Sequence, residues 1–220
     1  AGRTPMPAYT ETLATYRTRF LREVRDPTQQ YFSTQSDIDA WINEAIRWRD
    51  LWSGGSRAYK AAVPLTVGLD LYDFAVLFPN DTVLDLINLW LIWGNTRLPM
   101  SEGSLTEVTS RARPLVTYNN VPAMWCRYGA SKLFIATAPS AAYTADFDVA
   151  TLSGTLVLAA DADPLPYPYT EPVSKYAAYN AKQNQRRFDE ADVFYAEAVR
   201  ALQDIEGSRA GELPLTRHAR

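Results

Sequence analysis

The sequence contains only one cysteine, Cys126, and only one histidine, His218. A single cysteine excludes an intramolecular disulfide and a cysteine zinc site, which fits a reducing compartment or a particle assembled in one. Nucleophile triads need a histidine base, and His218 lies among the last residues, so a triad and a histidine-rich metal site are disfavoured. Cys126 occupies an alternating, strand-like run with no base nearby in the sequence, so we expect a buried structural thiol.

Long apolar runs, excess positive charge and phosphate-binding loops are also lacking. The most apolar run, Val83–Trp93, is too short to cross a bilayer and contains Asp85 and Asn88. The first residues lack the apolar centre of a signal peptide, and a net charge of −3 disfavours a general nucleic-acid binder. Gly54-Gly55 follows a predicted helix instead of preceding one, so it does not match a phosphate loop. We therefore expect a soluble protein made in the cytoplasm, with no membrane contact, metal or cofactor.

Aromatic residues, in contrast, are abundant. The 220 residues include 13 Tyr, 6 Trp and 8 Phe, a load that is typical of β surfaces and protein interfaces. The length allows one large domain or two small ones, each with a real core.

Residues 1–55 are predicted to form two N-terminal helices. The first runs from Thr10 to Arg25 and ends at Asp26-Pro27, because proline cannot continue a helix. The second, Thr34–Trp52, is expected to be capped by Ser36 and to stop at Ser53-Gly54-Gly55. Its residues separate into two faces by helical spacing. The apolar stripe comprises Ile38, Trp41, Ile42, Ala45 and Trp52, and the polar face comprises Asn43, Glu44, Arg47 and Asp50.

Residues 56–165 are predicted to form a β-rich insertion domain, either a small antiparallel sheet or an open barrel. Turn signals at Trp93–Thr96 and Gly129–Ser131 indicate hairpins, and Ser104–Arg113 indicates one short helix capped by Ser104 and stopped by Pro114. The expected strands are Tyr59–Val67, Leu71–Val76, Val83–Trp93, Trp125–Tyr128, Lys132–Thr137, Tyr143–Val149 and Thr155–Leu158.

Residues 166–206 are predicted to contain one long C-terminal helix, from about residue 171 to 206, that packs on the N-terminal helices. An apolar stripe with heptad spacing has two interpretations, an intramolecular core stripe or an oligomer seam. The stripe comprises Phe188, Ala191, Tyr195, Ala198, Leu202 and Ile205. Gly207 is expected to end the helix. Residues 207–220 form a basic tail with Arg209, Arg217 and Arg220 against Glu212, which indicates either simple disorder or docking into a partner.

Three Asp-x-Asp pairs are the only candidates for carboxylate chemistry or a hard cation. Asp37 and Asp39 are explained by the start of a helix, where carboxylates meet its positive end. Asp146 and Asp148 lie on one face of a strand with Phe147 on the other, and Asp161 and Asp163 lie in a predicted turn. Each pair thus has a structural explanation, and we expect no enzyme.

The order of several motifs resembles the head-to-tail adaptor (connector) proteins of tailed double-stranded DNA bacteriophages. The similarity covers most of the chain and includes no enzymatic motif. It is carried by Ser36–Ala45, Gly68–Tyr72, Phe78–Asp81, Val121–Trp125, Tyr128-Gly129, Leu133–Pro139 with Tyr143, and Val173–Ala181 with the helix that follows to Ile205. The aromatic run Leu89–Trp93 departs from the family pattern, and it is either a core strand or an interface.

The predicted elements together give an α+β fold, a bundle of the N-terminal helix pair and the C-terminal helix with the β domain inserted. The resemblance implies a virion protein at the head–tail interface that forms a homo-oligomeric ring, usually a dodecamer, beneath the portal protein. Double-stranded DNA would pass through the ring without sequence-specific binding, and the β-rich domain would meet a tail or nozzle protein. The tail would dock on the portal through Leu213, Leu215, Arg217 and Arg220, and Trp90 and Trp93 would make subunit or tail contacts.

Two other functions remain open from the residues alone. A glycan-binding or hydrolytic tail component would use the aromatic β face together with Asp146 or Asp148. A host-encoded interaction module with no phage role would remain a monomer.

Overall fold

The computed structural model describes residues 10–112 and 121–209. The fold is mixed α+β, and the chain divides into two compact units. Residues 1–56 and 153–220 make up the first, called the helical unit here, and residues 57–152 make up the second, the sheet unit. The second boundary therefore falls at 152/153, whereas the sequence placed it at 165. Residues 153–165 belong with the helices because they lead into a strand that pairs with the N-terminal segment.

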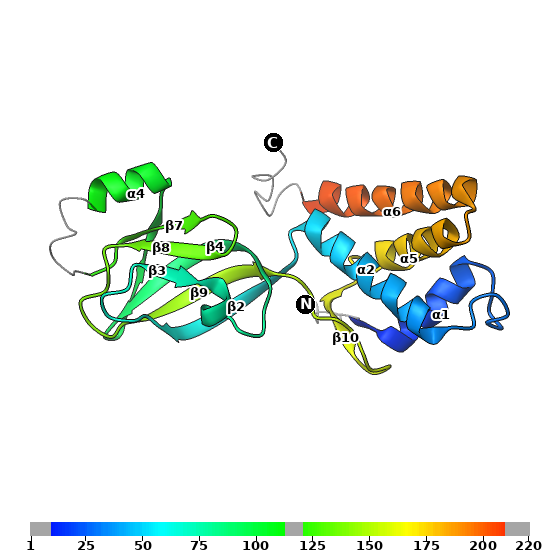
Figure 1. The fold of residues 1–220 in the computed structure, drawn as a ribbon, viewed down its shortest axis with the longest axis horizontal. Helices are drawn as coiled ribbons and strands as arrows, with labels where there is room; N and C mark the ends of the chain where they lie inside the picture. The colour runs from blue at the N-terminus through cyan, green and yellow to red at the C-terminus, as the bar shows by residue number, and fades with distance from the viewer. Residues whose placement is uncertain (1–9, 113–120, 210–220) are drawn as a thin grey trace, which may run out of the picture. The chain divides into compact units, whose positions relative to one another are not determined.

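Within its described residues, 10–56 and 153–209, the helical unit contains four helices and a short two-stranded sheet (Figure 1). The helices are α1 (Leu13–Glu23), α2 (Gln35–Ser53), α5 (Glu171–Asn184) and α6 (Phe188–Arg209). Strand β1 (Thr10–Thr12) pairs antiparallel with β10 (Ala162–Pro166). The core consists mainly of apolar side chains that recur every three or four residues on α1, α2 and α5. It comprises Leu13, Tyr16, Phe20, Leu21, Val24, Phe32, Ile38, Ile42, Ala45, Ile46, Leu156, Val173, Ala177, Ala178 and Ala181.

The prediction of a first helix that begins at Thr10 was wrong. Residues 10–12 form β1, and the helix begins at Leu13 after an N-cap at Thr12, whose side chain accepts the Thr15 N–H at 3.3 Å. The backbone N–H groups of Leu13 and Ala14 donate to the carbonyls of Asp161 and Ala159 at 3.0 and 3.1 Å. These partners come from a distant segment, so local propensity gave no sign of the strand.

The second helix occupies α2 almost as predicted and ends at Gly54, which adopts a left-handed φ of 78°. Three details of the prediction were wrong. The cap residue is Thr34, not Ser36, and Asp50 is fully buried instead of lying on the polar face. Trp52 is 53% exposed instead of lying on the buried stripe.

The predicted long C-terminal helix is two helices, α5 and α6, joined at residues 185–187. Arg186 has a φ of 59°, and Arg187 N–H donates to the Lys182 carbonyl at 3.0 Å, which closes the turn. Fully buried alanines, Ala177 and Ala181 on α5 and Ala191 and Ala198 on α6, let α5 and α6 pack closely against each other. Of the predicted heptad stripe, Ala191, Ala198, Leu202 and Ile205 are therefore buried within the unit, while Phe188 and Tyr195 are exposed. Helix α6 also continues through Gly207 to Arg209.

In the part of the sheet unit that the structure describes, residues 57–112 and 121–152, there are two four-stranded sheets instead of one. The first has the order β2 (Ser56–Pro64), β9 (Thr144–Thr151), β4 (Val83–Trp93) and β5 (Thr96–Pro99). The second has the order β3 (Leu71–Asp73), β8 (Lys132–Ala136), β7 (Met124–Tyr128) and β6 (Ser101–Glu102). Strand β6 is parallel to β7, and the hairpins β4–β5 and β7–β8 are antiparallel, as the turn signals predicted.

One apolar core lies between these two sheets. Leu89, Leu91 and Phe147 reach it from the first sheet, and Trp125 and Leu133 reach it from the second. Alternation along each strand produces this arrangement, because successive side chains point to opposite faces. Burying a large apolar side chain of this kind stabilises the fold by about 1.5–3 kcal/mol.

Several strand predictions were wrong in this part of the chain. The run Leu71–Val76 is strand only to Asp73, because the Asp73 carboxylate accepts the Ala75 N–H at 2.9 Å and starts the short helix α3 (Phe74–Leu77). Residues 155–158 form no strand. The predicted short helix exists as α4 (Leu105–Ala112), with Ser104 accepting the Glu107 N–H at 3.2 Å; its predicted stop at Pro114 lies outside the described residues.

Candidate functional site

The described parts of the chain, 10–112 and 121–209, hold no group of three or more His, Cys, Asp and Glu residues arranged for a metal ion. No helix within those same ranges is both long and apolar enough to cross a membrane. Cys126 is buried, as expected, and burial raises the pKa of its thiol, which makes it a poor nucleophile. Candidate sites are therefore surfaces, and three of them stand out.

The first surface is the outer face of the first sheet, where Asp146 and Asp148 lie. Asp148 accepts hydrogen bonds from Arg57, including one from Nε at 2.7 Å, and from Asn88 Nδ2 at 3.2 Å. Asp146 accepts from the Tyr59 hydroxyl and from the Ala62 N–H at 2.9 Å, and it pairs with Arg97 at 3.2 Å. Phe147 points into the core on the opposite side, so the predicted alternation is confirmed.

These contacts decide what the two carboxylates can do. Burial alone would raise the pKa of Asp148, but the hydrogen bonds from Arg57 and Asn88 hold that pKa below its usual value. For Asp146, burial opposes the hydrogen bonds from Tyr59 and Ala62, and the net pKa is again lowered. A general acid of a glycosidase needs a raised pKa. Both carboxylates are thus ionised and bound to structural partners, which does not favour the hydrolytic alternative.

Two tryptophans on β4, predicted as contact residues, lie on opposite faces of that strand: Trp90 shares the outer face with Asp146, and Trp93 has the parity of the core residues Leu89 and Leu91. The Arg97 guanidinium stacks over the Trp90 ring at 3.9 Å from its centroid, and Trp90 is half-buried. Trp93 is 52% exposed beside the β4–β5 turn. The structure gives each tryptophan a position compatible with contacts, and their role in binding stays a prediction.

The second surface, called the aromatic surface here, lies on the helical unit and was only partly visible in the sequence. It consists of five rings from α2, α5 and α6: Trp48, Trp52, Tyr176, Tyr179 and Tyr195. Trp48 stacks on Tyr176 at 4.1 Å, and Trp52 lies 6.2 Å from Trp48. The Tyr195 ring is 5.3 Å from Tyr179. Rings of this kind supply large contact area at low entropic cost and dominate many interfaces.

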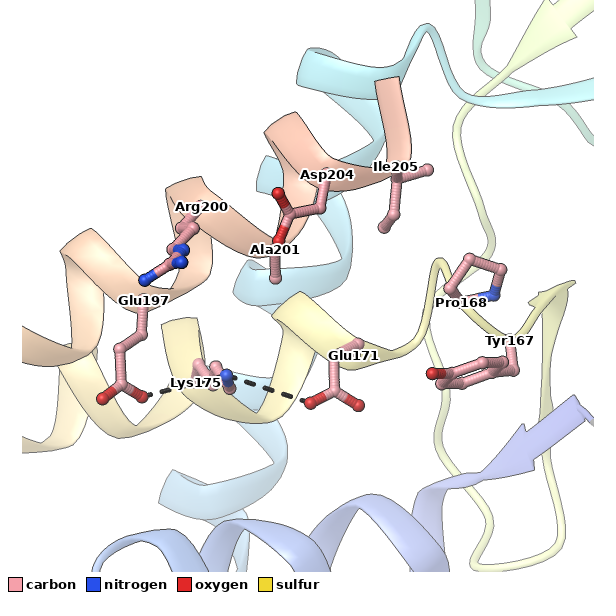
Figure 2. A pocket seen from close by; sticks show the side chains of 9 residues that line it. All are labelled: Tyr167, Pro168, Glu171, Lys175, Glu197, Arg200, Ala201, Asp204 and Ile205. Atoms are coloured by element: carbon pink, nitrogen blue, oxygen red, sulfur yellow. Dashed lines mark ion pairs between the residues drawn. The ribbon is translucent and has the colours of Figure 1, made fainter. Parts of the chain in front are cut away.

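The third surface is an open groove of about 640 Å³ on the helical unit (Figure 2). Tyr167 and Pro168 form one end, and α5 and the C-terminal half of α6 form the sides. Lys175 reaches towards Glu171 and Glu197, with N–O distances of 3.9 and 3.8 Å. The groove thus carries charges of both signs, and its shape indicates no particular ligand.

A buried ionic cluster lies within the helical unit, and the sequence did not indicate it. Arg49 donates to Asp163 at 2.5 and 3.1 Å and to Asp50 at 2.8 and 3.0 Å, and all three residues are fully buried. The Tyr16 hydroxyl donates to Asp163 at 2.6 Å. Burial and the Asp163 charge raise the pKa of Tyr16, whereas Asp163 hydrogen bonds raise the pKa of Arg49 against the effect of burial. Every charge has a partner, so the cluster is structural.

The remaining predicted residues have the following positions. Asp39 pairs with Arg17 at 2.6 Å, and Asp161 accepts the N–H groups of Val157 and Leu158, so these carboxylates are also structural. Leu213, Leu215, Arg217, Arg220 and His218 lie outside the described residues.

A comparison with known protein families gives a match that covers both units. The model of a family described as SU10 adaptor protein matches residues 11–218. No curated protein matches the sequence.

Proposed function

The chain belongs to the SU10 adaptor protein family, a phage head-to-tail adaptor family, and on that premise we propose that it forms a ring beneath the portal that joins the capsid to the tail. The observation that carries this proposal is the match over residues 11–218, which includes both units and part of the tail. The chain is a structural virion component of this family. The ring, the portal contact and the passage of DNA are the proposal.

A ring requires each subunit to present two different lateral faces that fit each other. The helical unit supplies surfaces of different character, because the aromatic surface spans α2, α5 and α6 whereas α1 carries arginines. We expect twelve copies, from the resemblance and not from the structure. Double-stranded DNA would pass through the centre, and a weakly acidic chain with a net charge of −3 would not retain it by phosphate attraction.

The portal contact is assigned to the tail beyond α6, through Leu213, Leu215, Arg217 and Arg220. Leucines supply apolar area, and arginines pair well with carboxylates on a partner. The sheet unit would face a tail or nozzle protein, and its Trp90 and Trp93 are the proposed contacts there or between subunits.

Co-sedimentation with portal rings of the same phage tests this function. We expect the full chain to bind the ring in stoichiometric amounts, and a variant truncated after Arg209 to lose binding by at least tenfold. Replacing Leu213 and Leu215 by serine should weaken binding nearly as much, whereas Glu212→Gln is the matched control in the same tail and should bind normally. A full chain that remains a monomer and does not bind the portal would contradict the proposal.

A further inference from the structure

The aromatic surface is exposed on one side of the helical unit and has no covering element among the described residues. Trp52 is 53% exposed and Tyr195 is 38% exposed, and neither side chain belongs to the buried core of the unit. Exposed, clustered Trp and Tyr residues mark contact sites more often than isolated ones do. Acidic groups lie beside the rings. Burial raises the pKa of Tyr176 most, and the nearby Glu44 charge raises it further. The exposed Asp192 lies one turn from Tyr195 on α6.

A second surface of the same unit presents two exposed arginines, with the half-buried Glu23 between them in the sequence. Arg22 and Arg25 lie at and just after the end of α1, both are exposed, and neither forms an ion pair within residues 10–112 and 121–209. Tyr31, in the loop that follows, is 74% exposed. These three residues are called the arginine surface here.

The loop that presents the arginine surface is held in one conformation. The buried Asp26 carboxylate accepts the N–H groups of Gln30, Tyr31 and Phe32 at 2.8, 2.8 and 2.9 Å. These bonds lower the pKa of Asp26 against the effect of burial, so the carboxylate remains ionised. Phe32 packs edge-to-face on Phe20 and on Trp41 in the core. A preorganised loop loses little conformational entropy when it binds.

The arginine surface lies on α1 and the loop that follows it, whereas the aromatic surface is formed by α2, α5 and α6. Helix α5 packs against both α1 and α6, and Figure 1 shows α1 on one side of it and α6 on the other. The two surfaces differ in character, and within residues 10–112 and 121–209 neither Arg22 nor Arg25 stacks on one of the five rings. This is the arrangement that a heterologous, head-to-tail contact requires.

We propose that the aromatic surface of one copy binds the arginine surface of the next copy, and that this contact closes the ring. Arg22 and Arg25 would lie on the faces of Trp52, Trp48 and Tyr195, where guanidinium groups are attracted by the ring electrons, and would pair with Glu44 and Asp192. Tyr31 would add buried area. The inference rests on the proposed ring and names the surfaces that form it.

Cross-linking on portal rings tests the contact directly. A variant with both Arg22→Cys and Trp52→Cys is bound to the portal and treated with a short bis-maleimide. We expect a ladder of covalent oligomers, because each copy then joins two neighbours. Mixing a copy that carries only Arg22→Cys with a copy that carries only Trp52→Cys should give dimers and nothing larger. The unmodified chain is the background control, since Cys126 is buried.

Three outcomes overturn the inference. If the double variant binds the portal but gives no ladder of covalent oligomers, the ring uses other surfaces, while the adaptor function would stand. Dimers from Trp52→Cys alone would indicate a two-fold contact of the aromatic surface with itself. Failure of the full, unmodified chain to bind the portal would remove the proposed function and with it the premise of this inference.

Charge reversal supplies a second readout that does not depend on cysteines. Arg25→Glu together with Arg22→Glu should reduce the number of copies per portal by at least fivefold. Arg186→Glu is the matched control. Like Arg25, Arg186 is an exposed arginine with a φ of 59° and no ion pair in the described parts of the chain. It lies in the α5–α6 turn, outside both surfaces. Circular dichroism should be unchanged in each variant. If Arg186→Glu reduced the number of copies per portal as much as the Arg22→Glu, Arg25→Glu variant does, the proposal would be contradicted.

Discussion

The buried cluster of the helical unit and the carboxylate pairs on the outer face of the sheet unit lie in opposite environments. In the helical unit, Arg49, Asp50 and Asp163 are fully buried and bind one another and neighbouring groups. In the sheet unit, Asp146 and Asp148 are nearly buried, but their partners Arg57 and Arg97 remain about half exposed on the outer face of the sheet. A buried charge that loses its partner stays in a medium of low polarity, whereas an exposed arginine returns to water. The first arrangement holds segments together, and the second leaves cationic groups available at a surface.

Removing one partner from the buried cluster should have the largest effect. Asp163→Ala leaves the Arg49 charge short of its main partner and the Tyr16 hydroxyl without an acceptor. We expect the helical unit to lose about 5 kcal/mol of unfolding free energy, the upper end for a broken buried pair. Denaturant unfolding followed by the helical circular-dichroism signal measures this loss.

The matched change on the sheet face is Asp148→Ala, which leaves Arg57 in water. It should cost about 1 kcal/mol or less. Equal losses for Asp163→Ala and Asp148→Ala would show that burial does not distinguish the two pairs.

A core substitution in the sheet unit should be nearly as costly. Phe147 is fully buried between the two sheets and packs edge-to-face on Phe78 at a centroid distance of 5.2 Å. Phe147→Ala is expected to cost about 4 kcal/mol through lost burial and a cavity. Hydrogen exchange should show faster exchange for amides of β4 and β9 and little change for α5. Faster exchange throughout both units would mean that they unfold together.

Acid should weaken the sheet unit through its surface pairs. The pKa values of Asp146 and Asp148 are lower in the fold than in the unfolded chain, so their stabilisation is present above about pH 4 and is lost as the pH falls through the folded pKa. In Asp148→Asn, the difference in unfolding free energy between pH 7 and pH 3 should be smaller than in the unmodified chain. Asp70→Asn, at an exposed carboxylate of the same unit, is the matched control. An unchanged difference for Asp148→Asn would contradict the assignment.

The smallest effect is expected for Arg97→Ala. Arg97 stacks on Trp90 and pairs with Asp146 at 3.2 Å, but it remains exposed to solvent. The loss should be about 0.5–1 kcal/mol in thermal unfolding, and Arg97→Lys should retain part of it because the charge remains. A loss above about 2 kcal/mol would mean that this face behaves like the buried cluster of the helical unit.

Local patterns predicted much of the sheet unit correctly. Strand β4 has the predicted limits Val83 and Trp93, and the β4–β5 and β7–β8 hairpins follow from their turn residues. The alternation in Asp146-Phe147-Asp148 correctly placed Phe147 inside and the carboxylates outside. In each case the structure depends on residues that are close in the sequence, or on the alternation of apolar and polar residues along a strand. Both patterns can be read directly from the sequence.

The helical unit was harder to predict, because its decisive contacts join distant segments. The end of α5 has neither glycine nor proline, so helical spacing continued through residues 185–187 without a sign of the turn. Asp163 looked like a turn residue, yet it meets Arg49 and Tyr16 from two other segments of the chain. The five rings of the aromatic surface come from three helices, and no linear pattern groups them.

The sequence by itself indicated the class of protein, because the order of its motifs pointed to the adaptor family whose model matches residues 11–218. Only the tertiary structure decided which charges are buried, where the helices turn back, and which aromatic side chains share a surface. The physical reason is that composition and short-range periodicity are local properties of the chain. Burial and ion pairing depend on segments more than a hundred residues apart, such as Arg49 and Asp163, being brought together by the fold.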